Sequence, residues 1–149
     1  YTTLSRSVFG PRQNPKGEAG VIAIFCLQIL KNEQPVVFGD GSKTRDYLYV
    51  GDVVKANVAA LHSGDGATLN LGWGLEISDQ EVFDTVSDVL DYHEKPMYSS
   101  PRPGEINRIA LNATRAYDMI RWKPEVHFRE GVELAARFYD ERTKNNPKT

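Results

Sequence analysis

The chain has 149 residues and a net charge of −2, with 40% hydrophobic and 26% charged residues. This size and balance are typical of one soluble domain with a buried core, and they exclude a broad basic surface for nucleic acid or acidic lipid. The longest apolar run, residues 21–27, is too short to span a bilayer, and the first ten residues lack the apolar core of a signal peptide. We therefore expect no nucleic-acid partner, no membrane partner and a cytoplasmic location.

The N-terminal third predicts a strand, a helix and two further strands. Residues 1–10 are rich in β-branched residues and end at a Gly-Pro turn, which favours a strand over this range. An almost wholly apolar helix is expected over 18–31, then a short strand in "EQPVVFGDG" and another over 45–50. Because the chain opens directly on a strand, we expect that it is cut from a longer one. The only cysteine, Cys26, falls in the apolar helix, so a buried, unreactive thiol in a reducing compartment is expected.

The middle third predicts two helices separated by a glycine-broken strand. Asp52 is a suitable N-cap for a helix to about residue 62. "TLNLGWG", residues 68–74, is predicted as a short strand, and Ser78 and Glu81 have the spacing of a capping box for a helix to about residue 90. The helix after Asp52 carries a stripe of apolar residues at helical spacing: Val53, Val54, Val58, Ala59 and Leu61.

The C-terminal third predicts an extended segment and two helices. Residues 95–105 are proline-rich and expected to be extended, Thr114 is expected to cap a short helix to Ile120, and an amphipathic helix is expected over 129–143. Short strands that alternate with helices predict a mixed α/β class.

The sequence contains no recognisable dinucleotide-binding, metal-binding or nucleophile motif. Three glycine pairs, beginning at residues 39, 64 and 72, lack the third glycine of a dinucleotide-binding loop, so we interpret them as turns. The three histidines are scattered, no spacing suits a metal, and no nucleophile motif is present.

Two arginines are better candidates for a site. Arg45 lies where a turn becomes a strand, and Arg102 lies between Pro101 and Pro103, which stiffen the backbone on both sides. A guanidinium on a rigid backbone suits phosphate oxygens, and Glu105 offers an acceptor for sugar hydroxyls. The residues alone leave two interpretations open, an anion clamp or exposed salt bridges.

Five ordered motifs carry a family resemblance: "VFGPRQNPKGEAGVIAIF", "PVVFGDGSKTRDYLYV", "LNLGWG", "RPGE" and "RWKPEV". Together they resemble the C-terminal half of the NAD-dependent epimerase/dehydratase family, the extended short-chain dehydrogenases, and most of all the UDP-glucose 4-epimerases within it. The resemblance implies one substrate-binding domain over 1–149, with a residual Rossmann strand at 1–10, a nucleotide-sugar-binding portion at 11–149, and the NAD-binding domain absent.

The resemblance also implies an isomerase activity that this chain cannot carry out alone. In the family a Tyr-x-x-x-Lys pair removes the sugar hydroxyl proton while hydride passes to NAD. No tyrosine of this sequence has lysine four residues later. We therefore expect no catalytic residue and no bound NAD in the chain by itself.

What the resemblance places on this chain is substrate binding. Arg45 and Arg102 would hold the diphosphate of a nucleotide sugar, most naturally a UDP-sugar. Glu105 would hold the ribose hydroxyls and Phe38 would lie along the uracil, whereas Tyr47 is expected to pack in the core.

Three other positions follow from the same comparison. The helix start at Val21 would offer a backbone contact, and Ser7 stands nearest a family asparagine that contacts substrate. Arg121 replaces a glycine in the turn before "WKP", and arginine is strained there by about 1 kcal/mol if the turn still needs a left-handed residue.

Two functions are carried forward. The first is the nucleotide-sugar-binding half of an epimerase-like enzyme. The alternative is a non-enzymatic remnant that binds no nucleotide sugar. In either case we expect a homo-oligomer, formed through strand edges and apolar helix faces that a missing half leaves uncovered.

Overall fold

The computed structural model describes residues 7–15 and 20–145 of the chain. Within these ranges the mixed α/β class is confirmed, and the elements alternate along the chain. The helices are α1 (Val21–Leu30), α2 (Val50–Ala60), α3 (Asp79–Val89), α4 (Thr114–Ile120) and α5 (Phe128–Asn145). The strands are β1 (Val8–Phe9), β2 (Val36–Phe38), β3 (Thr44–Arg45), β4 (Leu48–Tyr49), β5 (Ile77–Ser78) and β6 (Met97–Ser99).

The strands form three separate pairs in the described part of the chain. β1 pairs in parallel with β4, β2 pairs in parallel with β6, and β3 pairs antiparallel with β5. The strand predicted over residues 1–10 is represented by β1, and residues 1–6 lie outside the described ranges.

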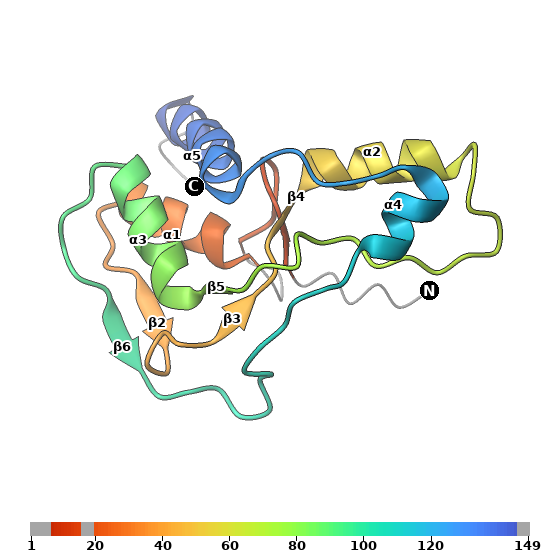
Figure 1. The fold of residues 1–149 in the computed structure, drawn as a ribbon. Helices are drawn as coiled ribbons and strands as arrows, with labels where there is room; N and C mark the ends of the chain where they lie inside the picture. Colours follow the sequence, from red (N-terminus) through yellow and green to blue (C-terminus); the bar gives the residue numbers. More distant parts are fainter. Residues whose placement is uncertain (1–6, 16–19, 146–149) are drawn as a thin grey trace.

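Two hydrophobic clusters hold these pairs together. The larger lies among α1, α3 and α5, which group on one side of the molecule, and the smaller lies between α2 and α4 on the other (Figure 1). α1 is apolar around its circumference and contacts both α3 and α5, as its composition predicts. In the described ranges no helix is both long enough and apolar enough to cross a lipid bilayer.

Cys26 and Tyr47 both lie in the larger cluster, which confirms their predicted burial. Cys26 is fully buried, and burial raises the pKa of its thiol to about 12, so the reactive thiolate is disfavoured. The Tyr47 ring packs against Phe9 and Phe128, and burial raises the pKa of its hydroxyl above the ordinary range for tyrosine.

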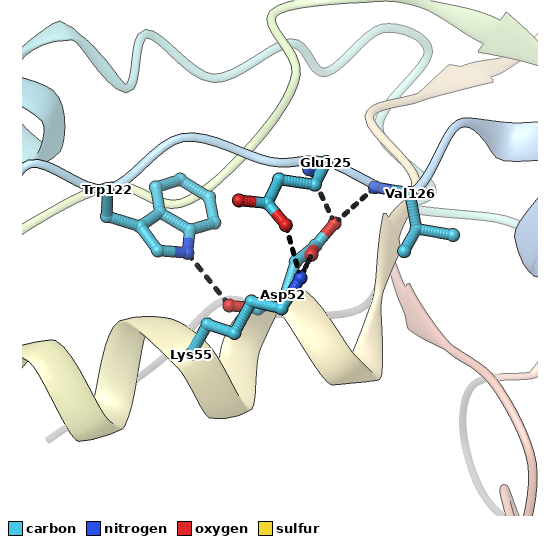
Figure 2. A network of polar contacts seen from close by, with 5 residues as sticks. All are labelled: Asp52, Lys55, Trp122, Glu125 and Val126. Atoms are coloured by element: carbon cyan, nitrogen blue, oxygen red, sulfur yellow. Dashed lines mark hydrogen bonds and ion pairs between the residues drawn. The ribbon is translucent and has the colours of Figure 1, made fainter.

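Asp52 is fully buried, but it does not cap α2 as predicted. The helix begins two residues earlier, at Val50, and the Oδ2 atom of Asp52 accepts hydrogen bonds from the backbone N–H groups of Glu125 and Val126, each at 2.9 Å. The backbone oxygen of Asp52 also accepts the Trp122 indole N–H at 2.8 Å (Figure 2). The residue therefore fastens a distant irregular segment onto α2 instead of capping a helix.

A second buried carboxylate explains why two strand predictions are wrong. Asp46 lies between β3 and β4 and accepts three backbone N–H groups, from Trp73 at 2.9 Å, Gly74 at 2.9 Å and Leu111 at 3.0 Å. The predicted strand over 45–50 is split at this residue, and the predicted strand over 68–74 is absent, with the N–H groups of Trp73 and Gly74 bonded to Asp46 and not to a neighbouring strand. A Cβ atom on Gly72 would lie 2.5 Å from Asp46 Oδ2, so the close approach requires glycine there.

The apolar stripe predicted on α2 is only partly buried. Val53 and Ala59 pack on the smaller cluster. Val54, Val58 and Leu61 are 55%, 53% and 79% exposed, because no described element covers that face of the helix. The exposed residues follow helical spacing, so they form one continuous apolar face.

The C-terminal elements follow the predictions closely, apart from one cap. α4 ends at Ile120 and α5 covers the expected range. Thr114 is the first residue of α4 and not its cap, and its N–H donates to the Asn112 side chain at 2.9 Å. Arg121 ends α4 in the left-handed region, with φ 55° and ψ 28°, so the turn does need a left-handed residue at this position.

The two buried carboxylates predict different responses to the change of aspartate to asparagine. Asp46 uses both oxygens, so Asp46→Asn turns an amide N–H₂ toward a backbone donor and should lower the free energy of unfolding by about 2–3 kcal/mol. Asp52 bonds both backbone donors through one oxygen, and its other oxygen contacts only the half-exposed Lys55 ammonium at 3.4 Å, so Asp52→Asn should cost less, about 1–1.5 kcal/mol. Urea unfolding of the two variants measures the difference. Equal losses would contradict this assignment of the acceptors.

The left-handed turn at Arg121 predicts a stabilising substitution. Arg121→Gly should raise the free energy of unfolding by about 1 kcal/mol, because glycine adopts this conformation without a Cβ clash. Arg121→Ala is the matched control, since it removes the long side chain but keeps the strain. The urea midpoint should rise for the glycine variant only, and a rise for alanine as well would mean that the side chain, not the backbone, is responsible.

Candidate functional site

Two segments that carry most of the predicted site residues lie side by side. The turn between β2 and β3 runs along the segment that follows β6, and Gly39 N–H donates to Ser99 O at 2.8 Å. Thr44 continues the contact, because its N–H donates to Asn107 O at 2.9 Å and its carbonyl accepts from Ile109 at 3.2 Å. The "GDG" and "RPGE" motifs therefore meet, although they are some sixty residues apart in the sequence.

Phe38 and Arg102 are in direct contact. Phe38 ends β2 opposite Ser99 of β6, and the chain then turns so that the Arg102 guanidinium carbon lies 3.8 Å from the centre of the Phe38 ring. This is a cation–π contact on the ring face, with an exposed arginine. Phe38, predicted to lie along the base, therefore contacts Arg102, predicted to bind the diphosphate.

Glu105 forms an ion pair with Lys43, whose side chain is only 11% exposed. Sequence reasoning missed Lys43, although it lies two residues before Arg45 on the same turn. The Glu105 carboxylate, predicted to accept ribose hydroxyls, therefore already has a cationic partner from this chain.

Arg45 folds back on its own backbone and lies close to a carboxylate. Its Nη1 atom donates to Thr44 O at 2.7 Å. Burial raises the pKa of Asp79, the first residue of α3, and the positive charge of Arg45 opposes that increase. Asp79 is also held by its backbone, since its N–H donates to Lys43 O at 2.9 Å.

The site region therefore contains the cations Lys43, Arg45 and Arg102 and the carboxylates Asp40, Asp79 and Glu105. These charges balance, so the suitability for an anion rests on the hydrogen-bond donors of the two guanidinium groups, and the confirmed capping box at Ser78 and Glu81 fixes the start of α3 beside them. Asp79 gave no sequence signal of its own, because its charged neighbours come from other parts of the chain.

Val21 and Ser7 have their described contacts elsewhere. Val21 begins α1 and packs against the larger hydrophobic cluster. The carbonyl of Ser7 accepts Leu48 N–H at 3.0 Å and extends the β1–β4 pair. Among the contacts of the described residues, none joins either one to the charged site, so their substrate roles stay predictions.

An open groove on the described surface lies apart from these residues. Its volume is about 600 Å³, and none of the predicted site residues lines it. Its walls come from residues 72–74, 110–114, 117 and 122–124. Nor do three His, Cys, Asp or Glu side chains gather as a metal site anywhere in the described ranges. The charged site is the better candidate, because its groups have the chemistry that a phosphate ligand needs.

Comparison with known proteins gives a consistent result. The family described as "NAD dependent epimerase/dehydratase family" matches residues 4–72. A putative UDP-glucose 4-epimerase of Methanocaldococcus jannaschii is 43% identical, over 100% of this chain and 47% of the relative. The crystal structure of a UDP-glucose 4-epimerase from Thermotoga maritima with UDP-glucose has a TM-score of 0.89 and 38% identity, covering 91% of this chain and 44% of that one. A Thermus thermophilus UDP-glucose 4-epimerase in complex with NAD has a TM-score of 0.80 and 36% identity, over 89% and 44% of the two chains.

The fold is thus that of part of an extended short-chain dehydrogenase. Residues 4–72 match the NAD-dependent epimerase/dehydratase family, and the chain resembles UDP-glucose 4-epimerases over nearly all of its length. It spans about half the length of the relatives that it matches.

Proposed function

We propose that this chain supplies the nucleotide-sugar site of a UDP-glucose 4-epimerase-like enzyme. The observation that carries the proposal is the meeting of the "GDG" and "RPGE" segments, which brings Arg102 onto the Phe38 ring and Glu105 onto Lys43. Its fold matches an epimerase whose crystal structure contains UDP-glucose. A nucleoside diphosphate sugar offers an aromatic base, hydroxyl groups and two phosphates, and each has a chemical counterpart here.

The residues divide the recognition among themselves. Arg45 and Arg102 bind the diphosphate oxygens, Phe38 stacks on the base, and Glu105 accepts the ribose hydroxyls after Lys43 releases it. Arginine suits the phosphates because its planar fork donates two parallel hydrogen bonds.

The redox step requires groups from outside these 149 residues. The sequence has neither a dinucleotide-binding glycine loop nor a Tyr-x-x-x-Lys pair, so its own residues do not fit NAD. NAD would accept and return hydride in the complete enzyme. This chain would bind and orient the sugar nucleotide, and it would have no epimerase activity by itself.

The proposal predicts measurable binding of UDP and UDP-glucose to the chain. Arg102→Ala should lower the affinity at least about tenfold, because it removes charge-assisted hydrogen bonds to phosphate. Isothermal titration calorimetry with UDP, UDP-glucose and a control nucleotide measures the effect.

A matched control separates the site from a general loss of positive charge. Arg115 is an exposed arginine of α4 that contacts Met119, so Arg115→Ala removes the same charge far from the two segments. It should leave the affinity unchanged. The absence of any UDP-dependent heat at millimolar ligand, in a folded wild-type chain, would rule out the proposed function.

The exposed face of α2 favours a second candidate, self-association of the chain without nucleotide sugar. The face presents Val54, Val58 and Leu61 to solvent, and a second copy of the same helix offers a complementary apolar stripe. Hydrophobic burial between the two copies would remove these side chains from water.

This candidate predicts a dimer that a single charge disrupts. Val58→Glu places a carboxylate in the middle of the face and should shift the chain to monomer in sedimentation and light scattering. Leu75→Glu is the control, since Leu75 is 56% exposed and lies outside α2. A wild-type chain that stays monomeric at high concentration would contradict self-association.

A further inference from the structure

The contact between Arg102 and Phe38 restricts how the proposed site can fill. A guanidinium carbon 3.8 Å from the ring centre is at stacking distance, which is also the distance that a nucleotide base needs from the same ring. One face of a phenylalanine ring cannot hold both groups. The base and the arginine therefore compete for this face.

We propose that Phe38 holds Arg102 in the empty site and exchanges it for the base when a nucleoside diphosphate binds. The inference rests on the proposed function and adds a specificity mechanism to it. Phe38 is then both the base platform and a positioning residue for Arg102, since it determines when the guanidinium is available to the diphosphate.

The local backbone favours such an exchange. Pro101 and Pro103 restrict the backbone on both sides of Arg102, and Gly39 lies against this segment, where a Cβ atom would be 3.7 Å from Pro101 Cβ. The main chain is thus confined, while the long arginine side chain is exposed and can rotate away from the ring. The movement requires side-chain rotation only.

The exchange discriminates between ligands that carry the same phosphates. A ligand with a base replaces the lost cation–π contact by stacking on the ring. Inorganic pyrophosphate also displaces Arg102 from the ring, but it has no base to stack there. The free energy of the lost cation–π contact therefore lowers the affinity for pyrophosphate. A cation–π contact at an exposed site corresponds to about a two- to fivefold change in affinity.

The test compares pyrophosphate with UDP in calorimetry on the full chain. Phe38→Leu should strengthen pyrophosphate binding about two- to fivefold, because Arg102 is no longer held. The same variant should weaken UDP binding, because the platform is lost. Combining it with Arg102→Ala should abolish the gain for pyrophosphate.

The chain contains a matched control, a second arginine over an aromatic ring. Arg121 lies 5.7 Å from the Tyr117 ring centre in another part of the fold. Tyr117→Leu removes a cation–π pair without touching the proposed site, so it should leave both affinities unchanged. A gain for pyrophosphate in this variant would overturn the assignment to Phe38.

A second measurement needs no variant and holds even if Phe38→Leu does not fold. The Arg102 side-chain NMR resonances should be shifted upfield by the Phe38 ring current in the free chain and should lose that shift on saturation with UDP. UDP binding with an unchanged ring-current shift would overturn the exchange but leave the proposed function standing. No heat with either UDP or pyrophosphate would overturn the proposed function and the exchange with it.

Discussion

Two buried carboxylates anchor the irregular half of this fold. Residues 61–76, 100–113 and 121–127 form neither helix nor strand, yet their backbone N–H groups need partners wherever they are covered. Asp46 and Asp52, on either side of β4, accept five backbone N–H groups between them. Each carboxylate joins segments that are far apart in the sequence. The position of these loops depends on the two side chains, whereas the contact between Phe38 and Arg102 depends on the β2–β6 pairing.

Each cation of the candidate site contacts a partner from this chain. Lys43 lies on Glu105, Arg102 lies on Phe38, and Arg45 lies on a backbone carbonyl, so each cation has a partner of moderate strength. Such partners keep the side chains ordered, yet a phosphate can outcompete them because its oxygens carry full charge. These three contacts therefore order the cations without preventing an anion from binding them.

Structural features that depend only on residues nearby in the chain could be predicted from the sequence. The capping box at Ser78 and Glu81 is set within one turn of chain, and its prediction is confirmed. The cap assigned to Asp52 was wrong because its real partners lie about seventy residues away. Lys43 was missed for the same reason, since its importance comes from Glu105. Arg102 was identified as a site candidate, but its contact with Phe38 depends on the β2–β6 pairing and not on local sequence.

That parallel pairing also has a consequence for the order in which the molecule assembles. β2 and β6 are about sixty residues apart, and closing so long a loop costs chain entropy before any contact compensates it. Helices α1 and α3 can form from local contacts, whereas the ring of Phe38 meets Arg102 only after β6 has docked. During synthesis the ribosome must therefore release the "RPGE" segment before this part of the surface exists, and its formation belongs to the late steps of folding.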